Sequence, residues 1–563
     1  MLRAAALLAL LSPCALAQIT APGQPVSEPF ASVAGLATAV PTELQAPVDV
    51  GRLLAEDEAR GKSGPWRYGE VLPVRYSIED SGAWSLGPNG ERVWRLRIVA
   101  PGALSVSLEF DAWELPEGSS LFLYDDERRD VYGAYGAHNN KDDGRMAILP
   151  FPGESVTLEY VEPAEIEQPA ALVIGSVIHG YRDVLGRIEE EDKSSGYAGS
   201  GGCNVDVNCP VASDWQDEKR SVCRTLSGGA LCSGALINNS AQDGTQYLLT
   251  ANHCGSMNGA IFLFNYERNG CGNGGTNSGQ SVQGSSLMVS ASSSDYRLVR
   301  VNQQIPASYG VYYAGWNRSS QAPSSTVGIH HPSGDVKKIC FDDDSPLKSG
   351  SNWRVADWEL GVTEGGSSGS PLFNNNGQII GQLCCGQAFC GFVFNDYYGR
   401  LDLSWSGLRP FLDPNNSGAV SVDGWDPNGG GGPGGPSCAV DAYGAGSPAA
   451  QIGTLALPVQ PQIGNTLTFT MQGFNGFIAT GIFFGSLGQS SIPFGDATIL
   501  VDTGATVISE LFTTTFGVGS VPVLLPSSSS LIGLKLYFQA GVQDATFSSG
   551  WATTNGLEVT ICG

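Results

Sequence analysis

Residues 361–371 read Gly361-Val362-Thr363-Glu364-Gly365-Gly366-Ser367-Ser368-Gly369-Ser370-Pro371, a run too rich in glycine and serine to form a helix or a strand. A hydroxyl that attacks a carbonyl needs small neighbours, so that a substrate backbone can approach, and backbone N–H groups aimed at the developing negative charge. We therefore take Ser368 as the candidate nucleophile, and the amides of Gly366 and Ser368 as the candidate oxyanion hole. Taken alone, the run is equally typical of a Gly/Ser surface loop.

Two other segments supply the partners that such a serine needs. A predicted apolar strand at residues 247–252 runs into His253, and Asp295 lies at the head of a second predicted strand. The histidine would take the serine proton and hand it to the leaving amine, while the aspartate would fix the tautomer of the ring and stabilise its charged form. The alternative for His253, one of five histidines in the chain, is a buried structural role.

The chain order of these three residues is histidine, aspartate, serine, which is the order in chymotrypsin-fold serine proteases. The pattern Gly-x-Ser-Gly-x-Pro at residues 366–371 resembles the nucleophile loop of the same proteases. The resemblance implies an all-β protease domain made of two β-barrels, which works by an acyl-enzyme and needs no cofactor.

Length and charge restrict the remaining possibilities. A chain of 563 residues suits three to four domains. Its net charge of −25, from 30 basic and 55 acidic residues, argues against nucleic-acid binding, which needs clustered Lys and Arg. We expect no membrane span, because no stretch beyond the first residues is long and apolar enough.

The first 17 residues have the features of a signal peptide. Leu2-Arg3 is a positively charged start, residues 4–11 are apolar, and Ala15-Leu16-Ala17 is a small-residue cleavage site, so we expect Gln18 to begin a secreted, extracellular chain. Loss of Cys14 would leave 12 of the 13 cysteines, an even number that predicts disulfides in an oxidising compartment.

Residues 18–193 are predicted to form a β-sandwich-like propeptide. Apolar and polar residues alternate over 93–99, 104–110, 120–124 and 156–160, with turn residues between them. The region ends in a charged run at residues 187–196, where a protease can reach the backbone, and we expect cleavage after Lys193. Trypsin-like zymogens need an aspartate directly before the nucleophile, but Ser367 stands there, so control by the N-terminal region is the expected mechanism. The alternative is a permanent accessory domain.

Residues 194–426 resemble the bacterial lysyl endopeptidases, which are secreted serine proteases that cut after lysine. The motifs that carry this resemblance are Gly202–Pro210, Leu249–Gly255, Ser294-Asp295, Ile329–Pro332, Gly361–Pro371 and Asn395–Arg400. The preceding region is similar to the propeptide of that family at Ile178–Arg182. The resemblance implies protein or peptide substrates, a monomeric enzyme, and a propeptide that acts as its chaperone or inhibitor.

The resemblance also implies three disulfides. They join Cys203 to Cys390, Cys209 to Cys271 and Cys232 to Cys254. Four cysteines lie outside the family pattern, and two further bridges among them are open possibilities: Cys223, Cys340, Cys384 and Cys385.

The substrate pocket is expected to take its charge from Asp396. Six residues before Ser368, where trypsins carry the pocket aspartate, this chain has Val362. Asp396 matches the aspartate that selects lysine in the lysyl endopeptidases, although a solvated turn residue is the alternative. Cys384 replaces the family's histidine beside the active site, and Trp353, in preference to Trp358, is our candidate for the tryptophan that stacks on it.

Two polar clusters are expected to be structural. His330-His331-Pro332 has no further ligand at metal-binding spacing, and the resemblance places it outside the catalytic site. Asp342-Asp343-Asp344 lacks the spaced oxygens and the glycine of a calcium loop. We expect no metal in this protein.

A Gly/Pro linker at residues 427–437 precedes a C-terminal domain at 438–563, predicted as a β-sandwich closed by Cys438 and Cys562. Attachment or substrate binding is its expected role, and a stabilising appendage is the alternative. Three functions therefore stay open: a lysine-specific endopeptidase, an endopeptidase of broader Arg/Lys or other specificity, and a surface-binding protein whose protease domain is idle.

Overall fold

The computed structural model describes most of the chain after residue 38. The described residues are 25, 39–62, 64–87, 90–166, 168–187, 199–272, 276, 280–427, 439–444, 447, 453–457, 461, 466–474, 478–525 and 534–561. The predicted signal peptide, the expected cleavage point after Lys193, most of the linker and the pair Cys438 and Cys562 lie outside these residues. In the part of the chain that is described, no helix combines the length and the apolar character needed to cross a membrane.

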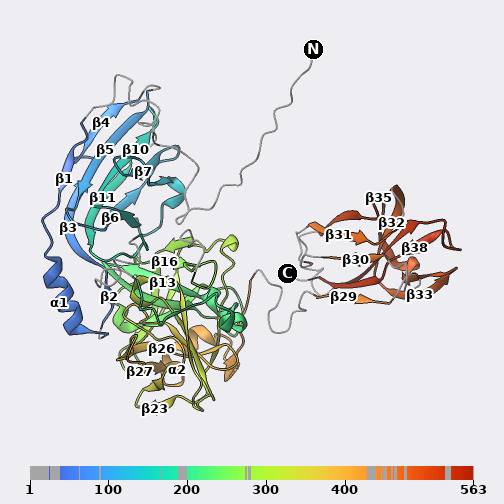
Figure 1. The fold of residues 1–563 in the computed structure, drawn as a ribbon. Helices are drawn as coiled ribbons and strands as arrows, with labels where there is room; N and C mark the ends of the chain where they lie inside the picture. The colour runs from blue at the N-terminus through green and yellow to red at the C-terminus, as the bar shows by residue number, and fades with distance from the viewer. Residues whose placement is uncertain are drawn as a thin grey trace. The chain divides into compact units, whose positions relative to one another are not determined.

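The chain divides into two compact units, Met1–Gly424 and Trp425–Gly563. The first unit contains both the N-terminal β domain and the predicted protease domain, drawn in blue to yellow in Figure 1. The second unit contains the C-terminal β domain, drawn in orange and red.

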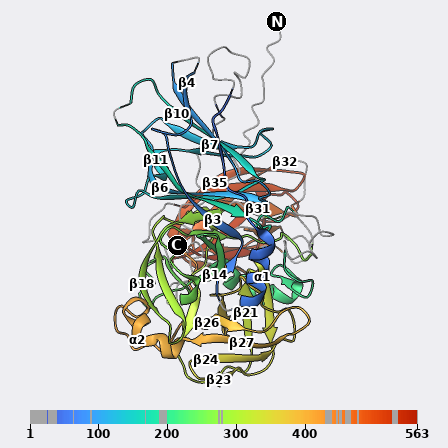
Figure 2. The same cartoon turned by 90° about the vertical axis from the view of Figure 1, so that its left-hand side faces the viewer.

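The N-terminal domain is a sandwich of two sheets, as the alternating pattern predicts. Figures 1 and 2 show these sheets as the blue and cyan layers above the strands of the protease domain. The first sheet holds β1 (Thr42–Leu44), β4 (Ala83–Leu86), β5 (Arg92–Val99), β7 (Ser120–Tyr124), β8 (Val131–Tyr135) and β10 (Ser155–Glu162). The second holds β3 (Gly69–Ser77), β6 (Ser105–Glu114), β9 (Met146–Pro152) and β11 (Ala171–Gly180). The strands expected at 93–99, 104–110, 120–124 and 156–160 are confirmed, each within a few residues.

The inward faces of these two sheets form one apolar core. Leu96 of β5, Leu108 of β6 and Leu158 of β10 are fully buried in it. Alternate residues along a strand point to opposite faces, so one side of each strand supplies the core and the other stays polar. The helix α1 (Val50–Arg60) begins at Asp49, whose side chain accepts a hydrogen bond from the backbone N–H of Arg52. The sandwich thus folds around its own core and carries α1 as an addition.

Two mainly antiparallel sheets make up the protease domain, and the predicted chymotrypsin-like double β-barrel is confirmed. The first sheet is built from β13 (Val222–Ser227), β14 (Ala230–Leu236), β15 (Tyr247–Ala251), β16 (Ile261–Phe264), β17 (Gln280–Gln283), β18 (Ser285–Ala291) and β19 (Tyr296–Val301). A short strand of the N-terminal domain, β2 (Trp66–Arg67), adds to it by pairing with β14.

The second sheet has a larger set of strands. They are β12 (Val205–Asp206), β20 (Gly315–Asn317), β21 (Thr326–His330), β22 (Lys338–Asp342), β23 (Leu347–Ser349), β24 (Asn352–Asp357), β25 (Pro371–Phe373), β26 (Gln378–Gly386), β27 (Phe394–Arg400) and β28 (Ser421–Val422). The helix α2 (Leu401–Leu412) follows β27 and buries Leu401 and Leu408 in a core that both sheets share. Because both sheets pack on this core, residues from either sheet can meet between them.

The three disulfides that the resemblance implies are all present, joining Cys203 to Cys390, Cys209 to Cys271 and Cys232 to Cys254. A fourth bridge joins the neighbouring residues Cys384 and Cys385. Cys223 and Cys340 are buried free thiols, so the second of the two extra bridges that we considered does not form. Burial raises the pKa of both thiols and keeps them protonated.

The N-terminal domain and the protease domain share a small core of their own. Tyr68, Ile178 and Val184 of the former pack with Leu231 and Ile261 of the latter. Polar contacts surround it: Gln283 Oε1 accepts a hydrogen bond from the backbone N–H of Ala147 at 2.9 Å. The fully buried Arg224 donates to the carbonyl oxygen of Val184 at 2.8 Å. The two domains therefore meet through a packed interface.

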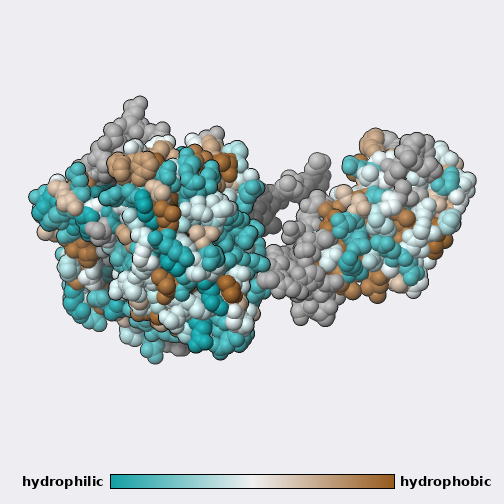
Figure 3. Space-filling view, turned by 90° about the horizontal axis from the view of Figure 1, so that it is seen from below, coloured by the Kyte–Doolittle hydropathy of each residue, from teal (hydrophilic) through white to brown (hydrophobic). Residues whose placement is uncertain are grey.

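The C-terminal unit is also a sandwich. One sheet contains β29 (Ala439–Tyr443), β32 (Ile478–Ser486), β35 (Thr506–Thr515), β37 (Lys535–Gln543), β38 (Trp551–Thr553) and β39 (Gly556–Thr560). The other contains β30 (Thr454–Ala456), β31 (Thr466–Gln472) and β36 (Gly519–Leu524), and a hairpin is formed by β33 (Gln489–Phe494) and β34 (Ala497–Val501). Phe469 packs against Phe483 and Phe538 at its centre. Figure 3 shows apolar residues in several brown patches on its surface.

Candidate active site

His253 and Asp295 lie in direct contact. Strand β15 ends at Ala251, the short 3₁₀ turn η5 (Asn252–Cys254) follows, and Asp295 immediately precedes β19, which pairs with β15. The Nδ1 atom of His253 is 2.6 Å from Oδ2 of Asp295, and the backbone N–H of His253 donates to Oδ1 at 2.9 Å. Both oxygens of the Asp295 carboxylate therefore bind His253. A proton on Nδ1 of the ring lets this nitrogen donate to Oδ2.

The other ring nitrogen of His253 has no fixed partner. Within the described residues, Nε2 is buried and makes no hydrogen bond. A neutral imidazole with its proton on Nδ1 leaves a lone pair on Nε2, which is the form required to accept a proton from a hydroxyl.

The backbone of Ser368 contacts the first sheet and Cys254, the residue that follows His253. The carbonyl oxygen of Ser368 accepts a hydrogen bond from the backbone N–H of Ser233 at 2.8 Å and lies 3.8 Å from Sγ of Cys254. Ser368 is 5% exposed. The loop at 361–371, which belongs to the second sheet, is thus attached to the strand β14 of the first sheet, next to the residue that follows His253.

Gly369 explains why this close attachment needs glycine. Its φ is +83°, and an added Cβ would lie 2.2 Å from Oγ1 of Thr250 and 2.4 Å from the carbonyl oxygen of Ser233. A side chain would therefore push the loop away from β14 and β15. The glycine-rich run is needed for packing between the two sheets as well as for access to a substrate.

The two candidate oxyanion donors, the backbone N–H groups of Gly366 and Ser368, make no hydrogen bond to the described residues. The N–H groups of Ser367 and Gly369, in contrast, bind the carbonyl oxygens of Glu364 and Leu383. The N–H groups of Gly366 and Ser368, with one residue between them in the chain, are available to bind a developing oxyanion.

Asp396 is a fully buried carboxylate on β27. Its Oδ2 accepts hydrogen bonds from Nε1 of Trp358, at 2.9 Å, and from the hydroxyl of Thr363. Its Oδ1 lies so close to Gly386 of the paired strand β26 that an added Cβ there would be 1.9 Å away. Asp396 is therefore not a solvated turn residue, because burying a carboxylate is costly unless its oxygens find partners.

The structure brings Trp358, rather than Trp353, to this carboxylate. Trp353 is buried in the core of the second sheet, where its Nε1 donates to the carbonyl oxygen of Ile380 at 3.2 Å and the guanidinium of Arg400 packs over its ring. Cys384 is half-buried on β26 and is bridged to Cys385, which pairs with Tyr397 next to Asp396. The disulfide thus lies on the strand that borders the Asp396 carboxylate.

His330 and His331 flank the nucleophile loop, although we expected them outside the catalytic site. Nδ1 of His330 is 2.8 Å from Oγ of Ser367, the residue before the candidate nucleophile. Burial, with the nearby charges of Lys62 and Lys338, lowers the pKa of His330 to about 3. The residue before the candidate nucleophile is thus held by a neutral histidine.

Candidate metal ligands are few among the residues that the structure describes. One group is Cys232, His253 and Cys254, whose two cysteines are bonded to each other. The other is the set of carboxylates of Asp344, Asp357 and Glu359. Of the acidic run Asp342-Asp343-Asp344, which we weighed as a calcium site, only Asp344 belongs to one of these two groups.

Sequence reasoning missed one residue of this site, Lys62. Its Nζ lies 3.3 Å from Oδ1 of Asp396 and 2.9 Å from the carbonyl oxygen of Thr363. Nothing around Lys62 in the sequence distinguishes it, because it is a single lysine between Gly61 and Ser63, far from the protease motifs. Thr363 could have been found, since it belongs to the nucleophile loop itself.

Two comparisons of the sequence with known proteins find relatives of one kind. Residues 197–399 match the family model for the lysyl endopeptidase C-terminal domain. A curated relative, the lysyl endopeptidase of Pseudomonas aeruginosa, is 26% identical over 366 residues, which are 59% of this chain and 77% of that protein.

Two solved structures are also similar to part of the chain. A Glu endopeptidase in complex with MPD is 18% identical, with a TM-score of 0.26, over 34% of this chain and 89% of that one. A mutant of human heparin binding protein is 16% identical, with a TM-score of 0.27, over 36% of this chain and 95% of that one.

The fold and the sequence relatives define the class: this chain is a serine protease. Within that class it is similar to the bacterial lysyl endopeptidases.

Proposed function

We propose that this protein is a secreted serine endopeptidase that cleaves peptide bonds on the carboxyl side of lysine. Ser368 attacks the carbonyl carbon, His253 takes the hydroxyl proton and delivers it to the leaving amine, and Asp295 holds the ring and stabilises the imidazolium. A water molecule then hydrolyses the acyl-enzyme by the same route. The N–H groups of Gly366 and Ser368 bind the oxyanion in both steps.

The observation that carries the lysine specificity is the state of the Asp396 carboxylate. It is fully buried, and its Oδ1 contacts an ammonium group at 3.3 Å. The same ammonium lies 2.9 Å from the carbonyl oxygen and 2.8 Å from the hydroxyl oxygen of Thr363. Three acceptors match the three N–H groups of a lysine side chain.

This arrangement favours lysine over arginine. A guanidinium binds a carboxylate best in a planar fork that uses both oxygens. Here Oδ2 of Asp396 is already occupied by Trp358 and Thr363, so only Oδ1 faces the cation. We therefore favour lysine specificity over the broader Arg/Lys alternative.

We also propose that the chain is made as an inactive precursor (zymogen). Its N-terminal domain is packed on the protease domain and adds strand β2 to the first sheet. Removal of this domain after Lys193, and export by the signal peptide, are the remaining steps of this proposal.

The test is a cleavage-site profile on a peptide library with the processed enzyme. We expect cuts after lysine, their loss in Asp396→Asn, and their retention in Asp357→Asn, which lies on the paired strand β24 opposite Phe394. Labelling by a fluorophosphonate that disappears in Ser368→Ala would show a live nucleophile and exclude the idle-protease alternative. Lysine cleavage that survives in Asp396→Asn would overturn our explanation of the specificity.

A further inference from the structure

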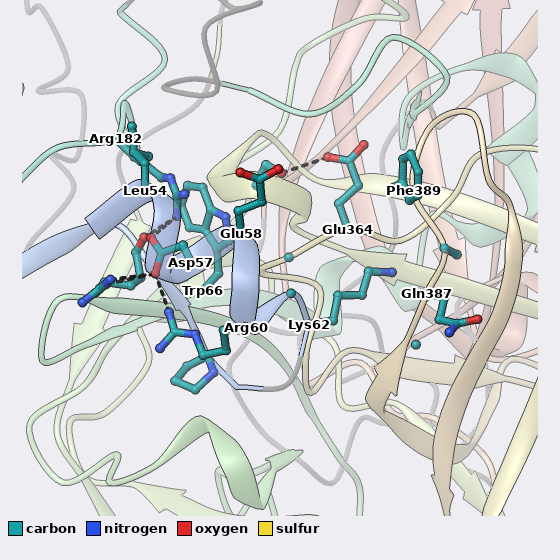
Figure 4. Close-up of a pocket in the computed structure, with 17 residues that line it drawn as sticks. Leu54, Asp57, Glu58, Arg60, Lys62, Trp66, Arg182, Glu364, Gln387 and Phe389 are labelled. Atoms are coloured by element: carbon teal, nitrogen blue, oxygen red, sulfur yellow. Dashed lines mark hydrogen bonds and ion pairs between the residues drawn. The ribbon is translucent and has the colours of Figure 1, made fainter. Parts of the chain in front are cut away.

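The ammonium in the lysine pocket belongs to the N-terminal domain of the same chain. Lys62 follows the helix α1 and its C-terminal cap, Gly61. Figure 4 shows its side chain extending from the end of this helix toward the segment that carries Gln387. Only 13% of the Lys62 side chain is exposed, although lysine side chains usually keep the charged end in water.

All the hydrogen-bonding capacity of this ammonium is used inside the protease domain. Its partners are the carbonyl oxygen and hydroxyl of Thr363, at 2.9 and 2.8 Å, and Oδ1 of Asp396 at 3.3 Å. Burial lowers the pKa of Lys62, and the charge of Asp396 acts in the opposite direction. A buried ammonium is costly unless it is paired in this way, so the contact is specific.

The segment that carries Lys62 is held on both sides. On the C-terminal side, Trp66 and Arg67 form β2, which pairs with Leu231 and Ala230 of β14. The ring of Trp66 also covers Gly365, where an added Cβ would lie 2.5 Å from Cδ1 of the indole. This strand addition fixes the path of the chain next to the nucleophile loop.

On the N-terminal side, α1 is held by the buried carboxylate of Asp57. Asp57 forms ion pairs with Arg67 at 2.9 Å and with Arg182 at 3.0 Å, and accepts a hydrogen bond from the hydroxyl of Tyr181 at 2.6 Å. Tyr181 and Arg182 belong to the segment after β11, so the helix is tied to the sandwich. Lys62 is therefore presented from a fixed support.

The two domains border an open pocket of about 740 Å³ at this place (Figure 4). Its walls include Leu54, Asp57, Lys62 and Trp66 of the N-terminal domain, and residues 364–365 and 386–389 of the protease domain. Lys62 thus lines this open pocket and also contacts Asp396, with Nζ 3.3 Å from Oδ1.

We propose that the N-terminal domain blocks the enzyme by placing Lys62 in the pocket as a surrogate for the substrate lysine. This inference rests on the lysine specificity proposed above. A substrate lysine and Lys62 compete for the same acceptors. The apparent affinity for substrate is therefore the affinity of the open pocket multiplied by the fraction of molecules in which Lys62 is withdrawn. Removal or displacement of residues 57–67 then opens the pocket.

The experiment uses the full chain with Ser368→Ala, which cannot process itself. The probe is a fluorescein-labelled tetrapeptide that ends in lysine, and its binding is followed by fluorescence polarisation. We expect Lys62→Gln and Lys62→Met to bind the probe at least tenfold more tightly than the parent, and Asp396→Asn to abolish that gain. The methionine variant keeps the length of the side chain and removes its charge.

Lys141→Gln is the matched control. Lys141 also reaches from the N-terminal domain to the protease domain, with Nζ 3.3 Å from Oε1 of Gln283, but it does not contact Asp396. Its variant should bind the probe as the parent does. Thermal unfolding of each variant checks that it is folded.

Two outcomes distinguish this inference from the proposed function. If the processed enzyme cuts after lysine but both Lys62 variants bind the probe within twofold of the parent, Lys62 is not the competing group and the inference is wrong. If the processed enzyme does not cut after lysine, the proposed specificity fails, and the inference fails with it.

Discussion

Asp295 accepts two hydrogen bonds from His253, one from Nδ1 of the ring at 2.6 Å and one from the backbone N–H at 2.9 Å. A single carboxylate thus fixes both the position of the residue and the direction of its ring. Rotation of the imidazole would break the first bond while the second stays in place, so the ring orientation depends on the charge of Asp295.

Asp295→Asn should therefore lower kcat about 10⁴-fold with little change in KM, because the amide favours the wrong ring tautomer while the geometry survives. The measurement is steady-state hydrolysis of a lysyl ester by the processed enzyme. Asp343→Asn, an exposed carboxylate, is the control and should behave as wild type. A loss in kcat below tenfold would show that Asp295 does not orient a catalytic base.

Gly369→Ala should destabilise the protein far more than Gly418→Ala. Both glycines have positive φ, +83° and +75°, so both variants carry the cost of a left-handed conformation, about 1–2 kcal/mol. Only Gly369 has backbone and side-chain atoms within 2.4 Å of the new Cβ, whereas Gly418 has nothing within 4 Å. Urea unfolding in the Ser368→Ala background gives the difference, and equal midpoints for the two variants would contradict the close packing between the sheets.

The disulfides Cys232–Cys254 and Cys209–Cys271 should differ in their effects on stability and on catalysis. Loss of Cys232–Cys254, with a sequence separation of 22, should cost about 3 kcal/mol, and loss of Cys209–Cys271, with a separation of 62, about 4 kcal/mol. Cys254 follows His253 directly, so only the double Cys→Ala variant at 232 and 254 should also lower kcat, by about tenfold or more. Denaturant unfolding and ester hydrolysis are the measurements, and equal effects on kcat would argue against a restraining role at the histidine.

His330 should make the protein less stable as the pH falls. Its pKa is lowered to about 3 in the folded chain by burial and by Lys62 and Lys338. Between its ordinary value near 6.5 and 3, the unfolded chain binds a proton that the folded chain does not, so stability is complete above pH 6.5 and is lost below it. The loss is about 1.4 kcal/mol per pH unit, or about 3 kcal/mol at pH 4.

The measurement is urea unfolding of the Ser368→Ala chain at pH 7, 5.5 and 4. His330→Gln should reduce the slope of stability against pH, without removing it, because burial also lowers the pKa of His331. His138→Gln, at an exposed histidine, should keep the parent slope. An unchanged slope in His330→Gln would show that this histidine is not kept neutral by the fold.

Much of the fold could be predicted from local patterns. Alternating residues predicted the strands of both β domains, because one face of each strand must be buried. The three disulfides of the protease segment followed from its resemblance to a family. The residues proposed for catalysis were also recognisable in sequence, since a nucleophile loop needs glycine and serine in a short run.

The contents of the pocket depended on contacts between distant residues. Lys62 and Asp396 are 334 positions apart, and only the docking of α1 and β2 on the protease domain places them together. For the same reason no local pattern predicted that Trp358 donates a hydrogen bond to this carboxylate. Local composition predicts what a strand or a loop can be, but the partner of a buried charge is chosen by how whole domains pack, and no local pattern contains that information.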